Sequence, residues 1–202
     1  MGVQITRSFG ELSKRLKKGC LEPTMRKVSK YLVSSAVGKI NSNIPPENAP
    51  LTQKVKGGNN TLRDSGHLMG SIAPQSGKSW AAAQTNLKYA KINQEGGEIT
   101  GKGKGLWLPA SAKTRTLMRR YNAQKPGELI NAMKADGYSF SRTGKVFCAR
   151  TRNGKPFALF VIKRSVKIPA RPFLYIDEQD EKYISREIKK AVHEALQGDG
   201  KS

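Results

Sequence analysis

Near both ends of the 202-residue chain, apolar residues recur every three or four positions, and this spacing constrains the fold more than any other feature of the sequence. The first stripe begins just after Pro23 and consists of Met25, Val28, Leu32, Ala36 and Ile40. The second stripe ends before Gly198 and consists of Ile184, Ile188, Val192 and Leu196. Each stripe predicts an amphipathic helix, and Asp177 or Asp180 is placed to cap the second helix.

A shorter helix is predicted before the first stripe. Ser8 and Glu11 have the spacing of a capping box, in which each residue satisfies a backbone amide of the first helical turn. The residues Leu12, Leu16 and Cys20 then follow at helical spacing.

Strand signals lie between the terminal helices. Residues 71–74 and 79–85 are predicted as two short strands joined around Gly77-Lys78, with a helix as the alternative for the alanine run at 81–83. Residues 145–150 and 157–162 are predicted as a hairpin with a turn at Asn153-Gly154. This order predicts an α+β protein with N-terminal helices, a central and mainly antiparallel β-sheet that carries a basic insertion, and a C-terminal helix. The length fits one domain over residues 1–202.

The remaining segments have weaker patterns. Residues 45–66 are rich in Pro, Asn and Gly and are predicted as a long exposed loop, and residues 89–97 as a short helical turn stopped by glycines. Residues 101–152 have the character of an insertion, with two weak helices. Because those helices share little apolar surface with the terminal stripes, we expect residues 111–136 to be replaceable by a short linker without loss of the fold.

Positive charge is concentrated in one part of the chain. There are 37 Lys and Arg residues against 15 Asp and Glu, a formal net charge of +22, and residues 101–171 hold 17 of the basic residues with two acidic ones. Two interpretations stay open, a wall that meets DNA phosphates or a surface that docks on acidic proteins. The residues predicted to face DNA are Lys102, Lys104, Arg115, Arg119, Arg120, Arg150, Arg152 and Lys155.

Signals for enzymes, metals and membranes are missing from the sequence. It has no named catalytic signature, and His67 and His193 have no partners at metal-ligand spacing. The cysteines Cys20 and Cys148 lie far apart, which argues against a disulfide scaffold. No apolar run approaches the roughly 20 residues of a membrane span. We therefore expect an intracellular, non-enzymatic protein without cofactor, metal or membrane contact.

Three short motifs are more specific. The first is Leu62-Arg63-Asp64-Ser65-Gly66-His67-Leu68-Met69-Gly70-Ser71-Ile72, the second is Tyr89-Ala90-Lys91-Ile92-Asn93-Gln94-Glu95-Gly96-Gly97, and the third is Ile168-Pro169-Ala170-Arg171-Pro172-Phe173-Leu174. Together and in this order they resemble the phage virion morphogenesis proteins, also called tail-completion or neck proteins, of tailed and Mu-like bacteriophages. The resemblance covers residues 8–98 and 156–197, and Asn93 stands where the family pattern has histidine.

The resemblance implies a structural virion protein that acts in tail completion and head–tail joining. It implies a homo-oligomeric ring, six-fold or a multiple of six, at the neck or the head-proximal end of the tail, with other neck, connector and tail proteins as partners. The protein would reside in the virion, and in the host cytoplasm during assembly. The alternative is a basic, sequence-nonspecific nucleic-acid-binding protein.

The motifs also supply the predicted assembly residues, which combine apolar anchors, an aromatic hydroxyl and a forked cation. They are Leu68, Ile72, Tyr89, Ile92, Arg171 and Phe173. For Arg171 two roles stay open, a clamp on the chain's own C-terminal helix or a contact with a neighbouring subunit.

Overall fold

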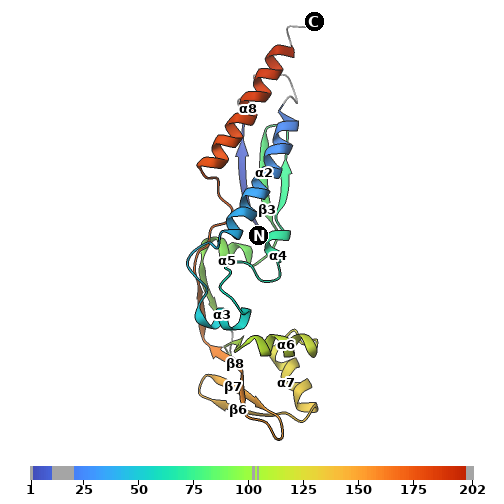
Figure 1. Ribbon diagram of the computed structural model, residues 1–202, viewed down its shortest axis with the longest axis vertical. Helices are drawn as coiled ribbons and strands as arrows, with labels where there is room; N and C mark the ends of the chain where they lie inside the picture. The colour runs from blue at the N-terminus through green and yellow to red at the C-terminus, as the bar shows by residue number, and fades with distance from the viewer. Residues whose placement is uncertain (1, 11–20, 102, 104, 199–202) are drawn as a thin grey trace. The chain divides into compact units, whose positions relative to one another are not determined.

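A computed structural model describes residues 2–10, 21–101, 103 and 105–198 (Figure 1). The chain divides into two compact units. Unit 1 consists of Met1–Pro46, Thr61–Gly96 and Pro169–Ser202, and unit 2 consists of Glu47–Asn60 and Gly97–Ile168. Helices and antiparallel strands occur together, and a helix closes the chain, so the α+β prediction is confirmed. The strands are divided among three antiparallel sheets.

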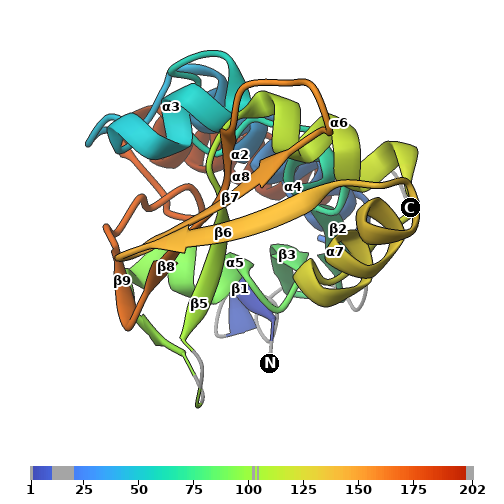
Figure 2. The ribbon, with the colours of Figure 1, turned by 90° about the horizontal axis from the view of Figure 1, so that it is seen from below.

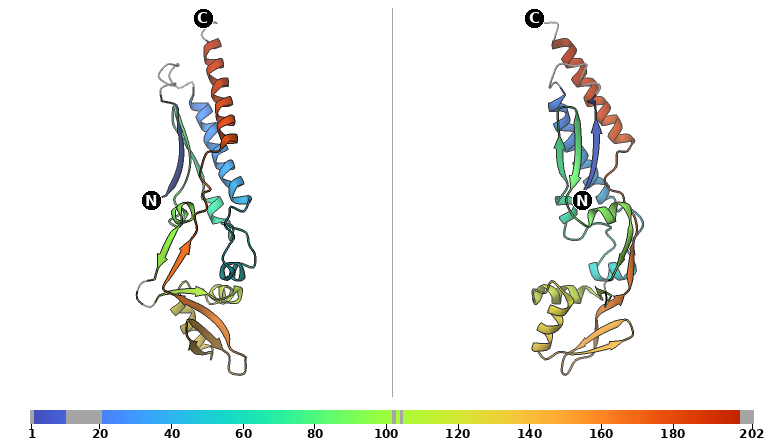
Figure 3. Two further views of the ribbon diagram at one scale, coloured as in Figure 1. Left: turned by 90° about the vertical axis from the view of Figure 1, so that its left-hand side faces the viewer. Right: turned by 180° about the vertical axis from the view of Figure 1, so that it is seen from behind.

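Unit 1 pairs a three-stranded sheet with two long helices. The sheet has the order β1-β3-β2, formed by Val3–Ser8, Trp80–Thr85 and Ala73–Ser76. The helix α2 (Glu22–Asn41) lies against β2 and β3, and α8 (Glu178–Gly198) packs along α2 (Figure 3). The described residues of this unit also form two short helices, α4 (His67–Gly70) and α5 (Ala90–Glu95).

The core of unit 1 forms where the predicted stripes meet the sheet. All five residues of the first stripe are buried, and Ile184 and Ile188 of α8 belong to the same cluster. Ala81 and Ala83 of β3 are fully buried in it, and their small side chains let α2 lie close to the strand. The last residue of the second stripe departs from the prediction, because Leu196 is 65% exposed.

The beginning of the chain differs from its prediction. Ser8 ends strand β1, whose six residues pair with β3 from Val3↔Thr85 to Ser8↔Trp80, and is therefore not the cap of a helix at this point. The other residues of that predicted helix, Glu11, Leu12, Leu16 and Cys20, lie outside the described residues.

Both predicted hairpins are present, with the first strand at Ala73–Ser76 instead of residues 71–74. β2 and β3 pair antiparallel around Gly77, where an added Cβ would collide with the Trp80 ring. β7 (Val146–Arg150) and β8 (Phe157–Lys163) also pair antiparallel, with a bulge near Cys148. The connection between β7 and β8 spans residues 151–156 and is therefore longer than the two-residue turn that Asn153-Gly154 predicts.

Unit 2 has its own sheet and core. The four-stranded sheet has the order β5-β8-β7-β6, with β5 at Leu106–Pro109 and β6 at Ser139–Thr143, and a separate pair joins β4 (Gly97–Thr100) to β9 (Ser165–Ile168). The two weak helices are confirmed as α6 (Ala112–Arg120) and α7 (Pro126–Ala135) (Figure 2). The core consists of Leu117, Ala123, Leu129, Met133, Ala149, Leu159 and Phe160.

The second core contradicts the expectation that residues 111–136 can be replaced by a linker without loss of the fold. α6 and α7 bury Leu117, Leu129 and Met133 in a cluster distinct from that of the terminal helices, as expected. The same cluster includes Leu159 and Phe160 of β8, however, so removal of residues 111–136 would uncover the sheet of unit 2. The replacement that the sequence analysis treats as harmless is therefore expected to damage this unit.

The segment predicted as a long exposed loop also contains structure. Pro50–Lys56 forms α3, which ends at Gly57 with φ +74°. Asn48 is buried; its backbone amide donates to Asn59 Oδ1 at 3.1 Å, and its Nδ2 donates to the Asn60 carbonyl at 3.1 Å. Most residues of the segment are exposed, as predicted, but the prediction of a loop is wrong at Pro50–Lys56, which is helical, and at Asn48, which is buried and ties the two ends of the segment together.

Candidate functional site

The second and third motifs meet in unit 1 through one side chain. Gln94 Oε1 accepts hydrogen bonds from the backbone amides of Phe173 at 3.0 Å and Leu174 at 3.1 Å. Its Nε2 donates to the Leu174 carbonyl at 2.9 Å. The amide group of Gln94 therefore pairs with the extended third motif as a neighbouring strand would, and it holds that motif on α5.

Arg171 adds two further ties within the same unit. Its backbone amide donates to the Asn93 carbonyl at 2.7 Å, and its Nε donates to the Pro46 carbonyl at 2.8 Å. Arg171 is only 6% exposed, and burial lowers the pKa of its guanidinium. The Nε of Arg171 therefore binds the segment that follows α2. The sequence had suggested the C-terminal helix as its partner within the chain.

The first motif supplies apolar anchors to the same core. Leu68 of α4 and Ile72 are buried with Phe173 in the core cluster of unit 1. Ser71 Oγ and Thr85 Oγ1 lie 2.7 Å apart in a hydrogen bond that ties the motif to the end of β3. Gly66, at φ +81°, precedes α4 in the left-handed conformation that favours glycine.

The six predicted assembly residues thus occupy different environments. Leu68, Ile72, Arg171 and Phe173 are buried within unit 1, and Ile92 is half-buried. Tyr89 is 45% exposed at the start of α5. Their placement in an interface between subunits stays a prediction, and Tyr89 is the member whose ring is accessible at the surface.

A polar cluster that the sequence analysis did not predict joins α2 to α8. Lys39 Nζ lies 2.6 Å from Asp180 Oδ2 and 3.1 Å from Asp177 Oδ2, and it donates to the Tyr175 carbonyl at 2.7 Å. Asp180 is 1% exposed. The rings of Tyr31 and Tyr183 stack beside this cluster at 3.7 Å between centroids.

The same cluster caps α8. The Asp180 amide donates to Asp177 Oδ1 at 2.9 Å and the Asp177 amide donates to Asp180 Oδ2 at 3.1 Å, which is the reciprocal pattern of a capping box. The bond from the Asp180 amide, followed by the interaction with Lys39, lowers the pKa of Asp177. The prediction that Asp177 or Asp180 caps this helix is confirmed, and both residues take part.

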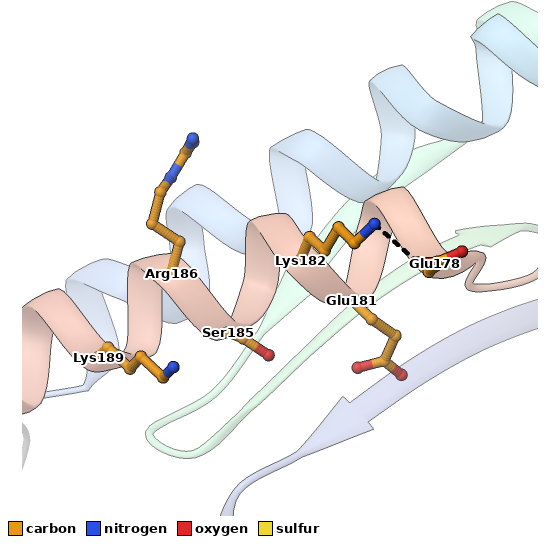
Figure 4. Close-up of a pocket in the computed structure, with 6 residues that line it drawn as sticks. All are labelled: Glu178, Glu181, Lys182, Ser185, Arg186 and Lys189. Atoms are coloured by element: carbon orange, nitrogen blue, oxygen red, sulfur yellow. Dashed lines mark ion pairs between the residues drawn. The ribbon is translucent and has the colours of Figure 1, made fainter.

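A surface pocket on α8 contains charged side chains that pair with neighbours. Figure 4 shows its lining, which consists of Glu178, Glu181, Lys182, Ser185, Arg186 and Lys189. Lys182 pairs with Glu178 at 2.7 Å, and Glu181 pairs with Arg7 of β1 at 2.8 Å. These exposed ion pairs are typical of a solvated helix face, and they supply no activated nucleophile or metal-binding group.

Unit 2 has a different charge balance. It contains eighteen Lys and Arg residues and only four carboxylates, Glu47, Glu98, Glu128 and Asp136. Glu128 accepts from the backbone amides of Gln124 at 2.8 Å and Lys125 at 3.1 Å, and these bonds lower its pKa. Asp136 accepts from Tyr121 Oη at 2.6 Å, a bond that raises the pKa of Tyr121. Four carboxylates can neutralise at most four of the eighteen cations, so at least fourteen positive charges of unit 2 are not balanced within the unit.

The residues predicted to face DNA belong to unit 2. Lys102 and Lys104 lie outside the described residues. Arg115 of α6 is half-buried and has interactions within the protein, and the other five are exposed: Arg119, Arg120, Arg150, Arg152 and Lys155. The first two of these lie on α6, and the last three lie at the end of β7 and in the connection to β8.

Sequence reasoning missed one basic element of this unit, the hairpin of β6 and β7. Its strands pair from Ser139↔Arg150 to Thr143↔Val146, and Gly144 begins the two-residue turn at φ +56°. The available signal was this glycine between two alternating runs, Ser139–Thr143 and Val146–Arg150.

Neither a metal centre nor a membrane helix is found in the described part of the chain. No group of three or more His, Cys, Asp or Glu residues is placed to hold a metal ion there. No helix among the described residues is long and apolar enough to span a bilayer.

Comparison with known proteins gave one match. A family model for the phage virion morphogenesis family matches residues 2–124, more than half of the chain. The match contains the first and second motifs and ends within unit 2, before the third motif. The comparisons with curated proteins and with solved structures each gave no match.

Proposed function

The chain belongs to the phage virion morphogenesis family, and on this premise we propose that it is a non-enzymatic structural protein that acts in tail completion and head–tail joining. The family match carries the proposal. The local structure supports it, because all three motifs help to build the core of unit 1 rather than a catalytic pocket. In this role the motifs maintain a rigid subunit that other virion proteins can recognise.

We place the protein in an oligomeric ring at the neck or the head-proximal end of the tail, six-fold or a multiple of six. Such a ring requires a heterologous interface, in which two different surfaces of each subunit meet. Tyr89 is the candidate from the second motif, because its ring is exposed while its neighbour Ala90 is fixed in the core. The other neck, connector and tail proteins are the expected partners.

The test is a deletion of the gene in the phage or prophage that encodes it, with the lysate viewed by electron microscopy. The expected result is separate heads and tails, or tails with aberrant ends, together with restoration of complete particles by the wild-type gene on a plasmid. A complementing gene with an early stop codon is the matched control. Complete, infectious particles at normal titre in the deletion lysate would contradict the proposal.

A second candidate function has one specific observation in its favour, the excess of positive charge in unit 2. In that case the protein would be a free, sequence-nonspecific nucleic-acid-binding protein. Negative-stain images of the purified protein separate the two candidates. Rings favour the virion role, and monomers that retard DNA in a gel favour the second candidate.

A further inference from the structure

The β6–β7 hairpin of unit 2 has two faces of different chemistry. Phe140 and Phe147 lie on the face that packs against the core of the unit, where their rings stack at 5.6 Å between centroids. Because side chains alternate along a strand, the opposite face of β6 carries the three hydroxyls of Ser139, Ser141 and Thr143. All three residues are exposed. Ser139 Oγ donates to the Arg150 carbonyl at 3.4 Å, so the row presents the hydroxyls of Ser141 and Thr143 as hydrogen-bond donors at the edge of the sheet.

Cations lie at both ends of this hydroxyl row. At the turn, Lys145 is exposed. Arg142 is also exposed, but it alternates with the hydroxyls along β6, pairs with Phe147 and donates from Nε to the Gly144 carbonyl at 3.0 Å, so it belongs to the opposite face. At the open end, Arg150 is paired with Ser139 in the strand register, and Arg152 follows it. Five residues of strand separate the two ends, or roughly 15 Å at the usual rise per residue.

This arrangement matches the phosphates on the two sides of a DNA groove. The major groove of duplex DNA is about 12 Å wide and admits a two-stranded β-ribbon. Arg, Lys, Ser and Thr side chains are the groups that commonly contact phosphate oxygens. Four carboxylates cannot neutralise eighteen basic residues in unit 2, so the counter-charge must come from outside this unit.

We propose that the β6–β7 hairpin is a duplex-DNA-binding element that contacts phosphates through Lys145, Arg150 and Arg152 and through the hydroxyls of Ser141 and Thr143. The inference rests on the proposed function, in which the genome is the polyanion close to the protein. The binding is independent of base sequence, because each of these contacts is made with the DNA backbone.

The test measures the affinity of the full-length protein for a fluorescein-labelled duplex of about 30 base pairs, by fluorescence anisotropy at several salt concentrations. One variant combines K145A, R150A and R152A. A control variant combines K30A, K78A and K88A, which removes the same number of charges from exposed positions of unit 1. Circular dichroism checks that both variants are folded.

We expect the hairpin variant to lose at least about tenfold in affinity and its log Kd to depend less steeply on log salt, by about three in slope. The control variant should stay within about twofold of the wild type. A variant with R150K and R152K should keep most of the affinity, since lysine preserves the charge. Equal losses in the hairpin and control variants, or a loss with lysine as large as with alanine, would overturn the proposal.

A second measurement locates the contact. Cys148 is half-buried, and it pairs with Ser141 in the strand register on the hydroxyl face of the hairpin. In a C20S background, we expect the duplex to slow alkylation of Cys148 by iodoacetamide, and an equal rate with and without DNA would overturn the proposal.

The outcomes are separable from those of the proposed function. A wild-type protein that completes virions but does not bind the duplex would overturn this inference alone. A protein that binds DNA through the hairpin while its deletion leaves virions complete would overturn the virion role alone.

Discussion

The side-chain oxygen of Gln94 accepts the backbone amide of Phe173 at 3.0 Å, so one residue of the second motif fixes the backbone of the third. The two residues are 79 positions apart in the chain. Phe173 is fully buried, and the hydrogen bonds of Gln94 hold its backbone while its ring fills the core. The motifs thus specify a tertiary contact, and substitutions at Gln94 and at other polar residues of unit 1 measure how much such contacts stabilise the fold.

Substitution Gln94→Met should lower the free energy of unfolding by about 1–3 kcal/mol, because it leaves the amides of Phe173 and Leu174 without their acceptor. Gln75→Met on the exposed strand β2 is the matched control and should change stability by under about 0.5 kcal/mol. Urea denaturation followed by circular dichroism measures both. Similar effects of the two substitutions would show that the Gln94 contacts contribute little.

Arg171→Ala should cost about 1–3 kcal/mol, because it removes a charge-assisted hydrogen bond to the Pro46 carbonyl together with a buried side-chain stem. Arg171→Lys should be almost as harmful, since lysine lacks the Nε donor and the planar fork. Thermal unfolding gives the stability, and light scattering of the folded protein gives the oligomeric state. A full-sized oligomer of unchanged stability in the alanine variant would contradict the expectation.

Lys39→Met should destabilise unit 1 by about 3 kcal/mol, because Asp180 would remain buried without its cation. The control is Arg26→Met on the same helix, which breaks an exposed i,i+4 pair with Glu22 and should cost under about 0.5 kcal/mol. Denaturant unfolding of both variants tests the difference. If Lys39→Met proves no worse than Arg26→Met, the buried pair is not a significant source of stability.

The capping carboxylate of Asp177 should make stability depend on pH. Its pKa is lowered from 3.8 in the folded protein, so its contribution is present above that value and is lost as the pH falls through the lower folded pKa. Asp177→Asn keeps a capping side chain but cannot titrate in this range, and it should flatten the decline of stability below about pH 4. Unfolding midpoints at several pH values measure the slope, and parallel curves for the two proteins would refute the assignment.

Replacement of residues 111–136 by a short Gly-Ser linker should remove half of the second core, including the fully buried Leu129 and Met133. We expect loss of the near-ultraviolet signal from Trp107, which packs edge-on against Phe147 and Phe160. Protection of the α2 amides from hydrogen exchange should remain, because α2 belongs to the other cluster. Exchange measured by mass spectrometry distinguishes this outcome from global unfolding, which would show that the two cores are not independent.

Much of the fold was predictable from local sequence patterns. The stripe from Met25 to Ile40 has strong helical periodicity, and the hairpin of β2 and β3 was indicated by two short runs on either side of Gly77-Lys78, so both were predictable. α3 was missed because Leu51 and Val55 are its only large apolar residues and prolines and glycines surround them. β6 was missed because its outward positions carry hydroxyls, which leaves Phe140 as its only inward aromatic residue.

Long-range polar contacts could not be predicted in the same way. Arg171 reaches Pro46 across 125 residues, and Lys39 reaches Asp180 across 141 residues. A charged residue on an amphipathic helix has the same local pattern whether it faces solvent or a buried partner, so no spacing rule identifies Lys39. The resemblance indicated that the motif residues matter, and the structure identifies the atoms with which they pair.

The division of unit 1 into three stretches of chain has a consequence for synthesis on the ribosome. When the nascent chain has been made as far as Ile168, every residue of unit 2 is present, but Phe173 and α8 are not. α2 has by then been synthesised without α8, whose Ile184 and Ile188 pack in the same core, so the part of its apolar surface that β2 and β3 do not cover is open to chaperones and to other nascent chains. Closure of the first core therefore waits for residues 169–188, and a premature stop before them would release a chain with one complete core and one that lacks Phe173, Ile184 and Ile188.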